Sequence, residues 1–444
     1  LVMVFTAGLP AAYLYFIPRI SRKEAKNLVY RINILLLILG ILLSCFIYFG
    51  SSLISFLLNN PNLEAPLRLF SVVPFLLLPT MGVENIFIAM SRAKVVGIYN
   101  FLSRLGLLVL ILSAVFFVGN EISTILWAWI FSASLTFSLA YVLKKWLFKK
   151  NTSEPSKIKN KEIFAYGYPL MLTSLVSIGV LSADQYFISS FGPEIFAEFS
   201  NGFMQLPLAG IVMSSIASVM TVTYSELFSK EKINKKKFEE LWLTATSKAI
   251  LLIYPLVIFF MIFAKETILI LFGDQYESSA FYFQMMLMVN FINITTVIPV
   301  ILSLGEVKFN FKLNLLVLIM IWPIEYLALI QFNSPYAIAF VSVIFNIFKT
   351  VACLYFIAKK IDININRLIP YQHILKVGIV SIVATGIAFL SGTMMIEFIS
   401  NQVIFLGICG LVFLLILLII APLFKLDYYS IIKPLVNKFL PKIN

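Results

Sequence analysis

The chain has 444 residues, of which 61% are hydrophobic and only 12% are charged, and its formal net charge is +13. A mean hydropathy of +0.97 excludes a soluble protein of this size, because the surface of such a protein needs far more polar side chains. The positive charge would indicate nucleic-acid binding only if the basic residues formed one face. They are instead distributed among the connections between apolar segments, so nucleic acid is excluded as a predicted partner.

Apolar segments long enough to cross a bilayer follow one another along the chain. A helix needs about 20 apolar residues to span a hydrocarbon core of about 30 Å. Thirteen segments meet this requirement, at approximately 1–17, 32–58, 68–90, 96–118, 122–143, 163–190, 202–225, 246–264, 280–304, 311–331, 336–358, 374–396 and 402–424. The sequence therefore predicts an all-α polytopic membrane protein.

Basic residues occupy every second connection between these segments. The basic connections are 19–31, 92–94, 144–161, 230–248, 308–312, 359–376 and 425–442. The connections between them contain one lysine, Lys265. Arg68 lies just after one of these connections, 59–66. Because cytoplasmic connections carry the excess of Lys and Arg in membrane proteins, we place the basic set in the cytoplasm. There it also meets membrane lipids with anionic headgroups.

The chain contains two copies of one design. A shift of 213 residues aligns Ser55–Phe70 with Ile268–Phe283, and spans one to five then match spans seven to eleven. Such internal similarity at a fixed spacing is typical of transporters built from repeats. The sixth span, 163–190, has no upstream counterpart. We therefore expect one helix to be missing from the first copy, and a native architecture of six plus six helices with a C-terminal pair.

The repeat divides the chain into four predicted regions. An N-lobe with five visible helices covers residues 1–148, and a cytoplasmic linker covers 149–162, where the sequence is polar, charged and contains proline. A C-lobe of six helices covers 163–358, and a C-terminal helix pair with a basic cytoplasmic tail covers 359–444. The tail from Lys425 has a pattern typical of an amphipathic interfacial segment.

Three stretches of the chain carry a resemblance to a known family. They are TAGLPAAYLYFIPRIS, YGYPLMLTSLVSIGVLSADQYFISSFGPEIFAEFSNGFMQL and LLIYPLVIFFMIFAKETILILFGDQYESS. They resemble the oligosaccharide flippases of the polysaccharide-transporter branch of the multidrug/oligosaccharidyl-lipid/polysaccharide exporter superfamily. Asp184 near the outer end of its span, and Leu271, Phe272 and Gly273 followed by Tyr276, fit the usual pattern of that family.

This resemblance implies two six-helix lobes around a central cavity. It also implies a substrate, a polyprenyl-diphosphate-linked oligosaccharide repeat unit for O-antigen or capsule, and its transport to the outer leaflet of the bacterial cytoplasmic membrane by alternating access. The similarity covers residues 1 to about 358, and the last two helices match members with fourteen helices. The missing first helix departs from the pattern and leaves the N-lobe wall of that cavity incomplete.

Ionisable residues inside apolar spans are costly and are therefore functional candidates. Arg104 and Lys349 lie about ten residues from the cytoplasmic ends of their spans, roughly 15 Å deep, where either would bind the diphosphate. The alternatives are an ion pair between Arg104 and Glu84, and snorkelling of Lys349 toward the interface. Asn346 and Asn290 are suited to binding sugar, or equally to interhelical hydrogen bonds. Further amides of this kind are Asn293, Asn314, Gln185 and Gln205.

Two acidic residues lie six to eight residues from the outer ends of their spans, Asp184 and Glu325. They predict a site for a coupling cation, a proton or sodium, whose binding removes a desolvation penalty and biases lobe closure. Glu84 is assigned to the same coupling or gating role. The alternative is a pair of acidic residues near a wet outer rim.

Other classes of function predict features that can be checked in the sequence. A multidrug or cation antiporter on the same scaffold would favour acidic over basic cavity residues, and Arg104 and Lys349 weigh against it. An enzyme such as a polymerase or glycosyltransferase would need a large outer loop or a catalytic domain. The chain has neither, nor a Walker A, HExxH, nucleophile-elbow or Rossmann motif. We therefore predict no enzyme activity, no metal site and no cofactor.

Overall fold

The computed structural model of the chain describes residues 2–57, 60–119, 121–149, 152–229, 234–395 and 401–428. Within these ranges the regular structure is helical, and none of it is β-strand. Eleven helical segments of the described part are long and apolar enough to cross a membrane, by length and composition. The all-α, multi-pass membrane class predicted from the sequence is thereby confirmed. Most of the predicted amphipathic tail, 429–444, lies outside the described residues.

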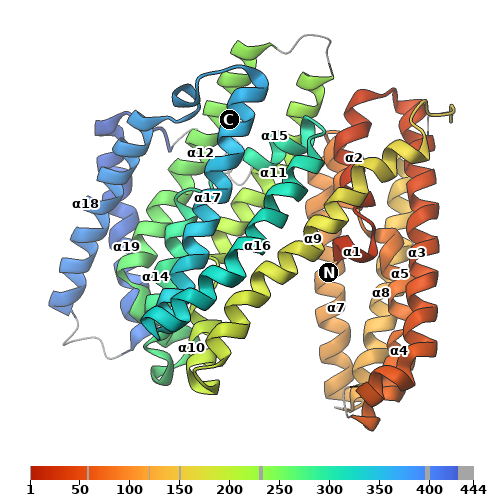
Figure 1. Cartoon of the computed structure of the whole chain (residues 1–444), viewed down its shortest axis with the longest axis horizontal. Helices are drawn as coiled ribbons and strands as arrows, with labels where there is room; N and C mark the ends of the chain where they lie inside the picture. Colours follow the sequence, from red (N-terminus) through yellow and green to blue (C-terminus); the bar gives the residue numbers. More distant parts are fainter. Residues whose placement is uncertain are drawn as a thin grey trace, which may run out of the picture. The chain divides into compact units, whose positions relative to one another are not determined.

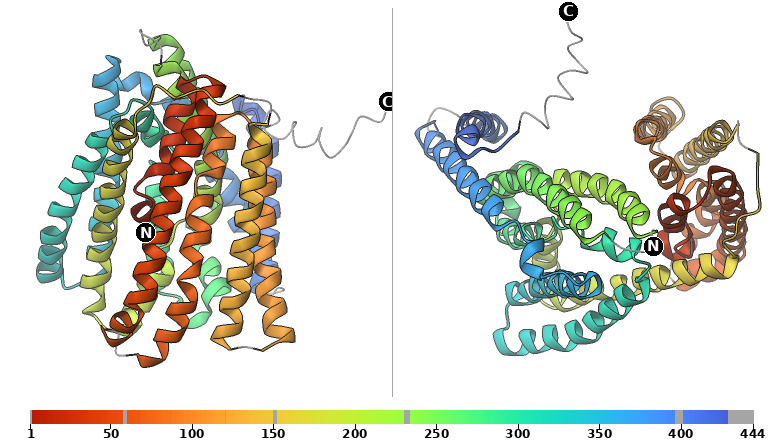
Figure 2. Two further views of the ribbon diagram at one scale, coloured as in Figure 1. Left: turned by 90° about the vertical axis from the view of Figure 1, so that its right-hand side faces the viewer. Right: turned by 90° about the horizontal axis from the view of Figure 1, so that it is seen from above.

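The helices form two compact units, each of which is described by itself. The first contains the described residues of 1–176, 221–231 and 302–312. Its helices are α1 (Val2–Phe5), α2 (Leu9–Phe16), α3 (Arg22–Leu57), α4 (Glu64–Phe70), α5 (Val72–Leu77), α6 (Val83–Ala89), α7 (Ala93–Phe117) and α8 (Ile122–Leu147). Figure 1 draws them in red to light orange, and in Figure 2 the long α7 and α8 run side by side.

The second unit contains the described residues of 177–220, 232–301 and 313–444. Its helices are α10 (Pro193–Gly202), α12 (Lys235–Ile262), α13 (Ala264–Phe272), α14 (Ser279–Asn290), α17 (Pro335–Ile361), α18 (Tyr371–Met395) and α19 (Gln402–Ile420). Four helices contribute residues to both units, namely α9 (Asn160–Ser189), α11 (Pro207–Phe228), α15 (Val297–Ser303) and α16 (Val307–Phe332).

Helix boundaries recur with the spacing of the sequence repeat. The shift of 213 residues carries Arg22, the first residue of α3, onto Lys235, the first residue of α12. It carries the start of α8 onto the start of α17, and the 3-10 turn Pro61–Leu63 onto the 3-10 turn Asp274–Tyr276. The starts of these three elements therefore occur twice, although most of the residues at equivalent positions differ.

One predicted span, 1–17, is broken into α1 and α2. The break falls at Ala7 and Gly8, whose φ angles are +49° and +67°. A Cβ atom at Gly8 would overlap the backbone carbonyl of Gly167 at the start of α9. Glycine is needed there because it alone adopts this conformation without a steric penalty and leaves room for the second backbone.

A second predicted span, 280–304, is divided into α14 and α15 around residues 291–296. In the first copy of the repeat the equivalent position is the break between α5 and α6, which contains Pro79 and Gly82. Gly82 has a φ of +86°, and proline cannot donate the helical hydrogen bond. Both copies therefore interrupt the same helix, which a hydropathy window reads as continuous.

Local sequence accounts for several helix starts. Before α3, the Ser21 amide donates to Glu24 Oε2 over 3.1 Å and the Glu24 amide donates to Ser21 Oγ over 3.3 Å, which is the reciprocal capping box. Before α12, the Asn234 side chain accepts a hydrogen bond from the Lys237 amide over 3.0 Å. Helix α17 begins with Pro335, whose fixed φ suits the first helical position.

Segments far apart in the sequence meet within the first unit. The Arg19 guanidinium donates to the Ser303 carbonyl over 2.6 Å and to the Tyr15 carbonyl, and it lies 3.7 Å from the centre of the Tyr15 ring. Tyr15 stacks on Tyr166 with a centroid distance of 4.4 Å. The Tyr166 hydroxyl donates to the Leu302 carbonyl over 3.1 Å. These contacts join the end of α2 to the start of α9 and the end of α15.

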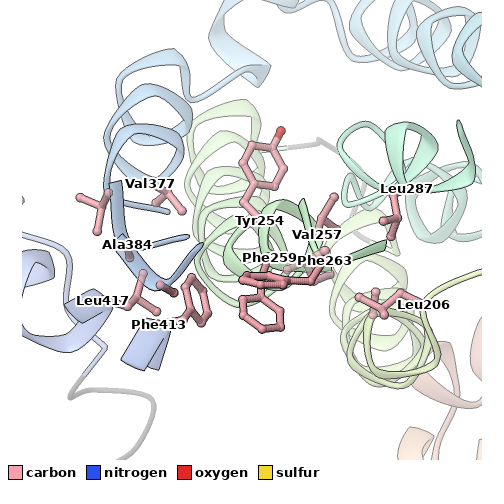
Figure 3. Packing of buried hydrophobic residues seen from close by; sticks show 14 of the residues in the cluster. Leu206, Tyr254, Val257, Phe259, Phe263, Leu287, Val377, Ala384, Phe413 and Leu417 are labelled. Carbon is pink, nitrogen blue, oxygen red and sulfur yellow. The ribbon is translucent and has the colours of Figure 1, made fainter. Parts of the chain in front are cut away.

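The core of the second unit lies where α12 meets the C-terminal helix pair. Phe259 of α12 and Phe413 of α19 pack with ring centroids 5.0 Å apart. Phe263, which lies between α12 and α13, belongs to the same buried cluster as Val377 and Ala384 of α18 (Figure 3). Between membrane helices such packing stabilises mainly through van der Waals contact. The C-terminal pair is therefore an integral part of this unit.

Candidate functional site

The site depends on a close approach of α9 and α16 in the second unit. Gly179 of α9 leaves room for Leu318 of α16, since a Cβ at Gly179 would lie 2.9 Å from Leu318 Cδ1. One turn later, Trp322 donates its Nε1–H to the Gly179 carbonyl over 3.1 Å. The next ionisable residues along the two helices, Asp184 and Glu325, are thereby held next to each other.

Asp184 and Glu325 form a buried carboxyl pair. Their side chains are hydrogen-bonded to each other, and the two residues are 4% and 0% exposed. The Ser342 hydroxyl of α17 donates to Asp184 Oδ1 over 2.6 Å and lies 3.4 Å from Glu325 Oε1. Two carboxylates in contact repel each other unless a proton or a cation lies between them. The geometry therefore suits a pair that shares a proton.

One oxygen of the pair has no hydrogen-bond partner among the described residues. This atom is Glu325 Oε2, and it is buried. A buried polar atom without a partner costs roughly 1–3 kcal/mol, and more when it is charged. An added proton or cation would remove that cost. In the described ranges no three His, Cys, Asp or Glu side chains are grouped as a metal site.

The carboxyl pair borders a cavity of about 330 Å³ within the second unit. Helices α9, α14, α16 and α17 line it, together with residues 203 and 205 before α11. Its polar lining residues are Ser177, Asp184, Gln205, Asn314, Ser342, Asn346 and Lys349. The remaining lining residues are apolar. A cavity of mixed polarity can hold a ligand that carries both charged and hydroxyl groups.

Helix α17 supplies a polar row to this cavity. Ser342, Asn346 and Lys349 follow at spacings of four and three residues, which places them on one helix face. Asn346 Nδ2 donates to the Ser342 carbonyl over 2.9 Å, and Lys349 Nζ donates to Asn314 Oδ1 over 3.5 Å. At the rise of an α-helix, Lys349 lies about 10 Å along the axis from Ser342 and the carboxyl pair.

Four of the predicted site residues meet at this cavity. Asp184, Asn346 and Lys349 line it, and Glu325 contacts the lining residue Asp184. Asn290 is not among the lining residues: it is half-buried on α14, and its Nδ2 donates to the Met286 carbonyl over 3.4 Å. The assignment of Asn290 to sugar binding therefore stays a prediction.

Arg104 and Glu84 belong to the first unit, on α7 and α6, and both are exposed. The ion pairs among the described residues do not include one between them. The Arg104–Glu84 ion pair considered from the sequence is therefore not formed in this structure. Diphosphate binding by Arg104 and gating by Glu84 stay predictions.

Sequence reasoning missed Ser342, which contacts both carboxyl groups. The signal was present, since Ser342 precedes Asn346 and Lys349 at helical spacing. For Asn293, the sequence left an interhelical hydrogen bond open as the alternative to sugar binding. The structure forms such a bond, because Asn293 Oδ1 accepts a hydrogen bond from Thr350 Oγ1 over 2.9 Å. This bond joins α17 to the segment between α14 and α15.

Solved structures of membrane transporters share this fold. A mutant of a MATE transporter from Vibrio cholerae matches with a TM-score of 0.68 and 12% identity, covering 81% of this chain and 86% of that one. A MOP superfamily transporter from Pyrococcus furiosus matches with a TM-score of 0.68 and 18% identity, covering 81% and 85%. An outward-facing multidrug resistance MATE family transporter matches with a TM-score of 0.69 and 17% identity, covering 81% and 85%. Identities this low establish the fold alone.

The sequence itself identifies the family. No curated protein matches the chain, but the family model described as polysaccharide biosynthesis protein matches residues 19–281. This match extends over more than half of the chain, and it confirms the resemblance carried by the three stretches quoted above. The fold is the one seen in the solved membrane transporters above. The chain belongs to the polysaccharide biosynthesis protein family.

Proposed function

We propose that this protein is a flippase, which moves a polyprenyl-diphosphate-linked oligosaccharide repeat unit across the bacterial cytoplasmic membrane by alternating access of two lobes. The product would serve surface polysaccharide biosynthesis, as O-antigen or capsule. The observation that carries the proposal is the cavity of the second unit, where Lys349 lies beside three amides, Asn314, Asn346 and Gln205. A cation suits a diphosphate, and amides suit sugar hydroxyls.

The main cost of flipping such a lipid is the transfer of a charged diphosphate through an apolar layer. Lys349 would offset this cost as a compact point charge inside the cavity. Arg104 of the first unit is kept as a separate candidate for binding the diphosphate, because its planar fork suits that group. We keep Asn290 in the sugar-binding set only as a secondary candidate, because its amide is engaged within α14.

We assign coupling to the carboxyl pair. Asp184 and Glu325 would take up a proton or sodium ion, and the changed charge would bias the conformational equilibrium by the difference in affinity between the two states. Glu84 of the first unit would act in gating. The support for this assignment is the contact between two buried carboxyl groups, one of which has an oxygen without a partner in the described structure.

A second candidate function is a multidrug or cation antiporter. The same carboxyl pair favours it, because a buried negative charge is what a cationic substrate would neutralise. Solved structures that share the fold include a multidrug resistance MATE family transporter. The Pyrococcus furiosus relative is described as having a binding pocket of reverse polarity, so pocket charge is a reasonable discriminator between the two functions.

The decisive experiment is complementation in a bacterial strain that lacks its own repeat-unit flippase. We expect the full chain to restore surface polysaccharide, and Lys349→Gln or Arg104→Gln to lower it at least tenfold at equal membrane abundance. Lys265→Gln is the matched control, because Lys265 is exposed and paired with Glu277 at 2.6 Å. Resistance to cationic drugs without restored polysaccharide would instead establish the antiporter.

A further inference from the structure

The cavity of the second unit contains charges of both signs. The carboxyl pair, Asp184 and Glu325, lies at one end of the polar row of α17, and Lys349 lies about two helical turns away. In the described structure, the titratable groups that face the cavity or the carboxyl pair are Asp184 of α9, Glu325 of α16 and Lys349 of α17. Helix α14 and the segment before α11 contribute Met286, Phe203 and Gln205, which do not titrate.

The charge of the carboxyl pair depends on how many protons it holds. With one shared proton the pair carries a single negative charge, and with two it is neutral. Asp184 and Glu325 are both buried, so water screens this charge only weakly. An anion beside Lys349 would therefore be repelled by the singly protonated pair and not by the neutral one.

We propose that a second proton on the Asp184–Glu325 pair strengthens the binding of a diphosphate beside Lys349, so that this cavity binds proton and substrate together. This inference rests on the proposed function, because it takes an anionic diphosphate as the substrate. By reciprocity, bound diphosphate favours uptake of the proton by the same factor. The row of Ser342 and Asn346 fixes the distance over which the two events are coupled.

Coulomb's law gives the size of the coupling. At a separation of about 10 Å and an effective dielectric constant of about 20, one unit charge changes the affinity for another on the order of tenfold. The sign is as informative as the size. A cationic drug would compete with the proton for the pair, and its binding would weaken as the pH falls. An anionic substrate binds more tightly as the pH falls.

The test is a binding measurement on the purified full chain. The probe is farnesyl-diphospho-N-acetylglucosamine, a short prenyl-diphospho-sugar whose diester diphosphate does not titrate near neutral pH. Its affinity is measured by calorimetry at pH 5.5 and pH 8.5, in sodium-free buffer of constant ionic strength. We expect binding at least tenfold tighter at the lower pH, because the diphosphate of the probe carries two negative charges.

Three variants separate the contributions. The double variant Asp184→Asn/Glu325→Gln mimics the neutral pair, and we expect it to bind the probe as tightly at pH 8.5 as at pH 5.5. Lys349→Gln should weaken binding on the order of tenfold at both pH values while keeping the pH dependence. Lys265→Gln, which alters an exposed ion pair, should behave like the wild type.

The outcomes distinguish this inference from the proposed function. Equal wild-type affinity at both pH values, or tighter binding at pH 8.5, overturns the coupling but leaves a diphosphate-binding cavity. No binding of the probe at either pH, by protein that elutes as a single folded species, overturns both. A pH dependence that persists unchanged in the double variant assigns it to other groups and also overturns the inference.

Discussion

The Ser342 hydroxyl is the smallest group on which the site depends. It donates to Asp184 Oδ1 over 2.6 Å and lies 3.4 Å from Glu325 Oε1, so one oxygen on α17 contacts carboxyl groups on α9 and α16. Ser342 is 3% exposed, and water cannot easily replace it. Hydrogen bonds to charged groups contribute roughly 1.5–3 kcal/mol. The hydroxyl therefore positions the carboxyl pair as well as stabilising it.

We expect Ser342→Ala to destabilise the protein by about 1–3 kcal/mol, because it leaves a buried carboxyl oxygen without its donor. The midpoint of thermal unfolding in detergent measures this. Ser182→Ala is the matched control: Ser182 is half-buried on α9, and its hydroxyl donates to the Ile178 carbonyl of its own helix over 2.8 Å in an exposed hydrogen bond. Equal midpoints for the two variants would show that the Ser342 bond contributes nothing.

At the scale of elements, close helix contacts depend on small residues. Helices α10 and α14 touch at Gly202, where an added Cβ would overlap the Ser279 carbonyl and lie 2.8 Å from Tyr282 Cβ. Tyr282 and Ser279 are fully buried. Because the obstacle is backbone and not the flexible end of a side chain, the helices themselves would have to move apart.

Gly202→Ala is therefore expected to lower stability by about 1–3 kcal/mol, the usual cost of overpacking. Gly210→Ala on α11 is the control, since no atom lies within 4 Å of its added Cβ. Alanine is the better helix former by about 1 kcal/mol, so the control should be neutral or slightly stabilised. The midpoints of thermal unfolding of the two variants test this. A Gly202→Ala protein as stable as the control would refute the close contact at Gly202.

At the scale of the whole molecule, the distribution of basic residues predicts orientation. Membrane proteins retain Lys and Arg on the cytoplasmic side, so the connection that contains Ser153 should face the cytoplasm and the one that contains Glu194 should face outward. Both residues are exposed. The orientation follows from charge alone and is independent of which substrate the cavity takes.

Single cysteines at these positions test the orientation. In a Cys45→Ala background, which removes the exposed native cysteine, a membrane-impermeant maleimide should label Glu194→Cys in intact cells and should not label Ser153→Cys. Both should be labelled once the cells are permeabilised. The reverse pattern in intact cells would invert the topology.

Much of the fold could be predicted from the sequence because its signals are local. Continuous apolar segments, basic connections and the 213-residue repeat depend only on residue order, and they predicted the helical, multi-pass membrane class. The family was predicted separately, from the resemblance of the three stretches quoted above. The breaks in 1–17 and 280–304 could not be predicted in this way. A hydropathy average does not detect that Gly8 lies against the backbone of Gly167, a contact between residues far apart in the chain.

The candidate site was likewise predicted only in part from the sequence. The sequence by itself determined that Asp184, Glu325 and Lys349 are ionisable residues within apolar spans, because burial in a bilayer is expected from composition. Only the tertiary structure decided that the two carboxyl groups touch and that Lys349 shares their cavity. The reason is rotational: which face of a helix meets its neighbour is set by packing such as Gly179 against Leu318. A hydropathy average cannot predict that contact.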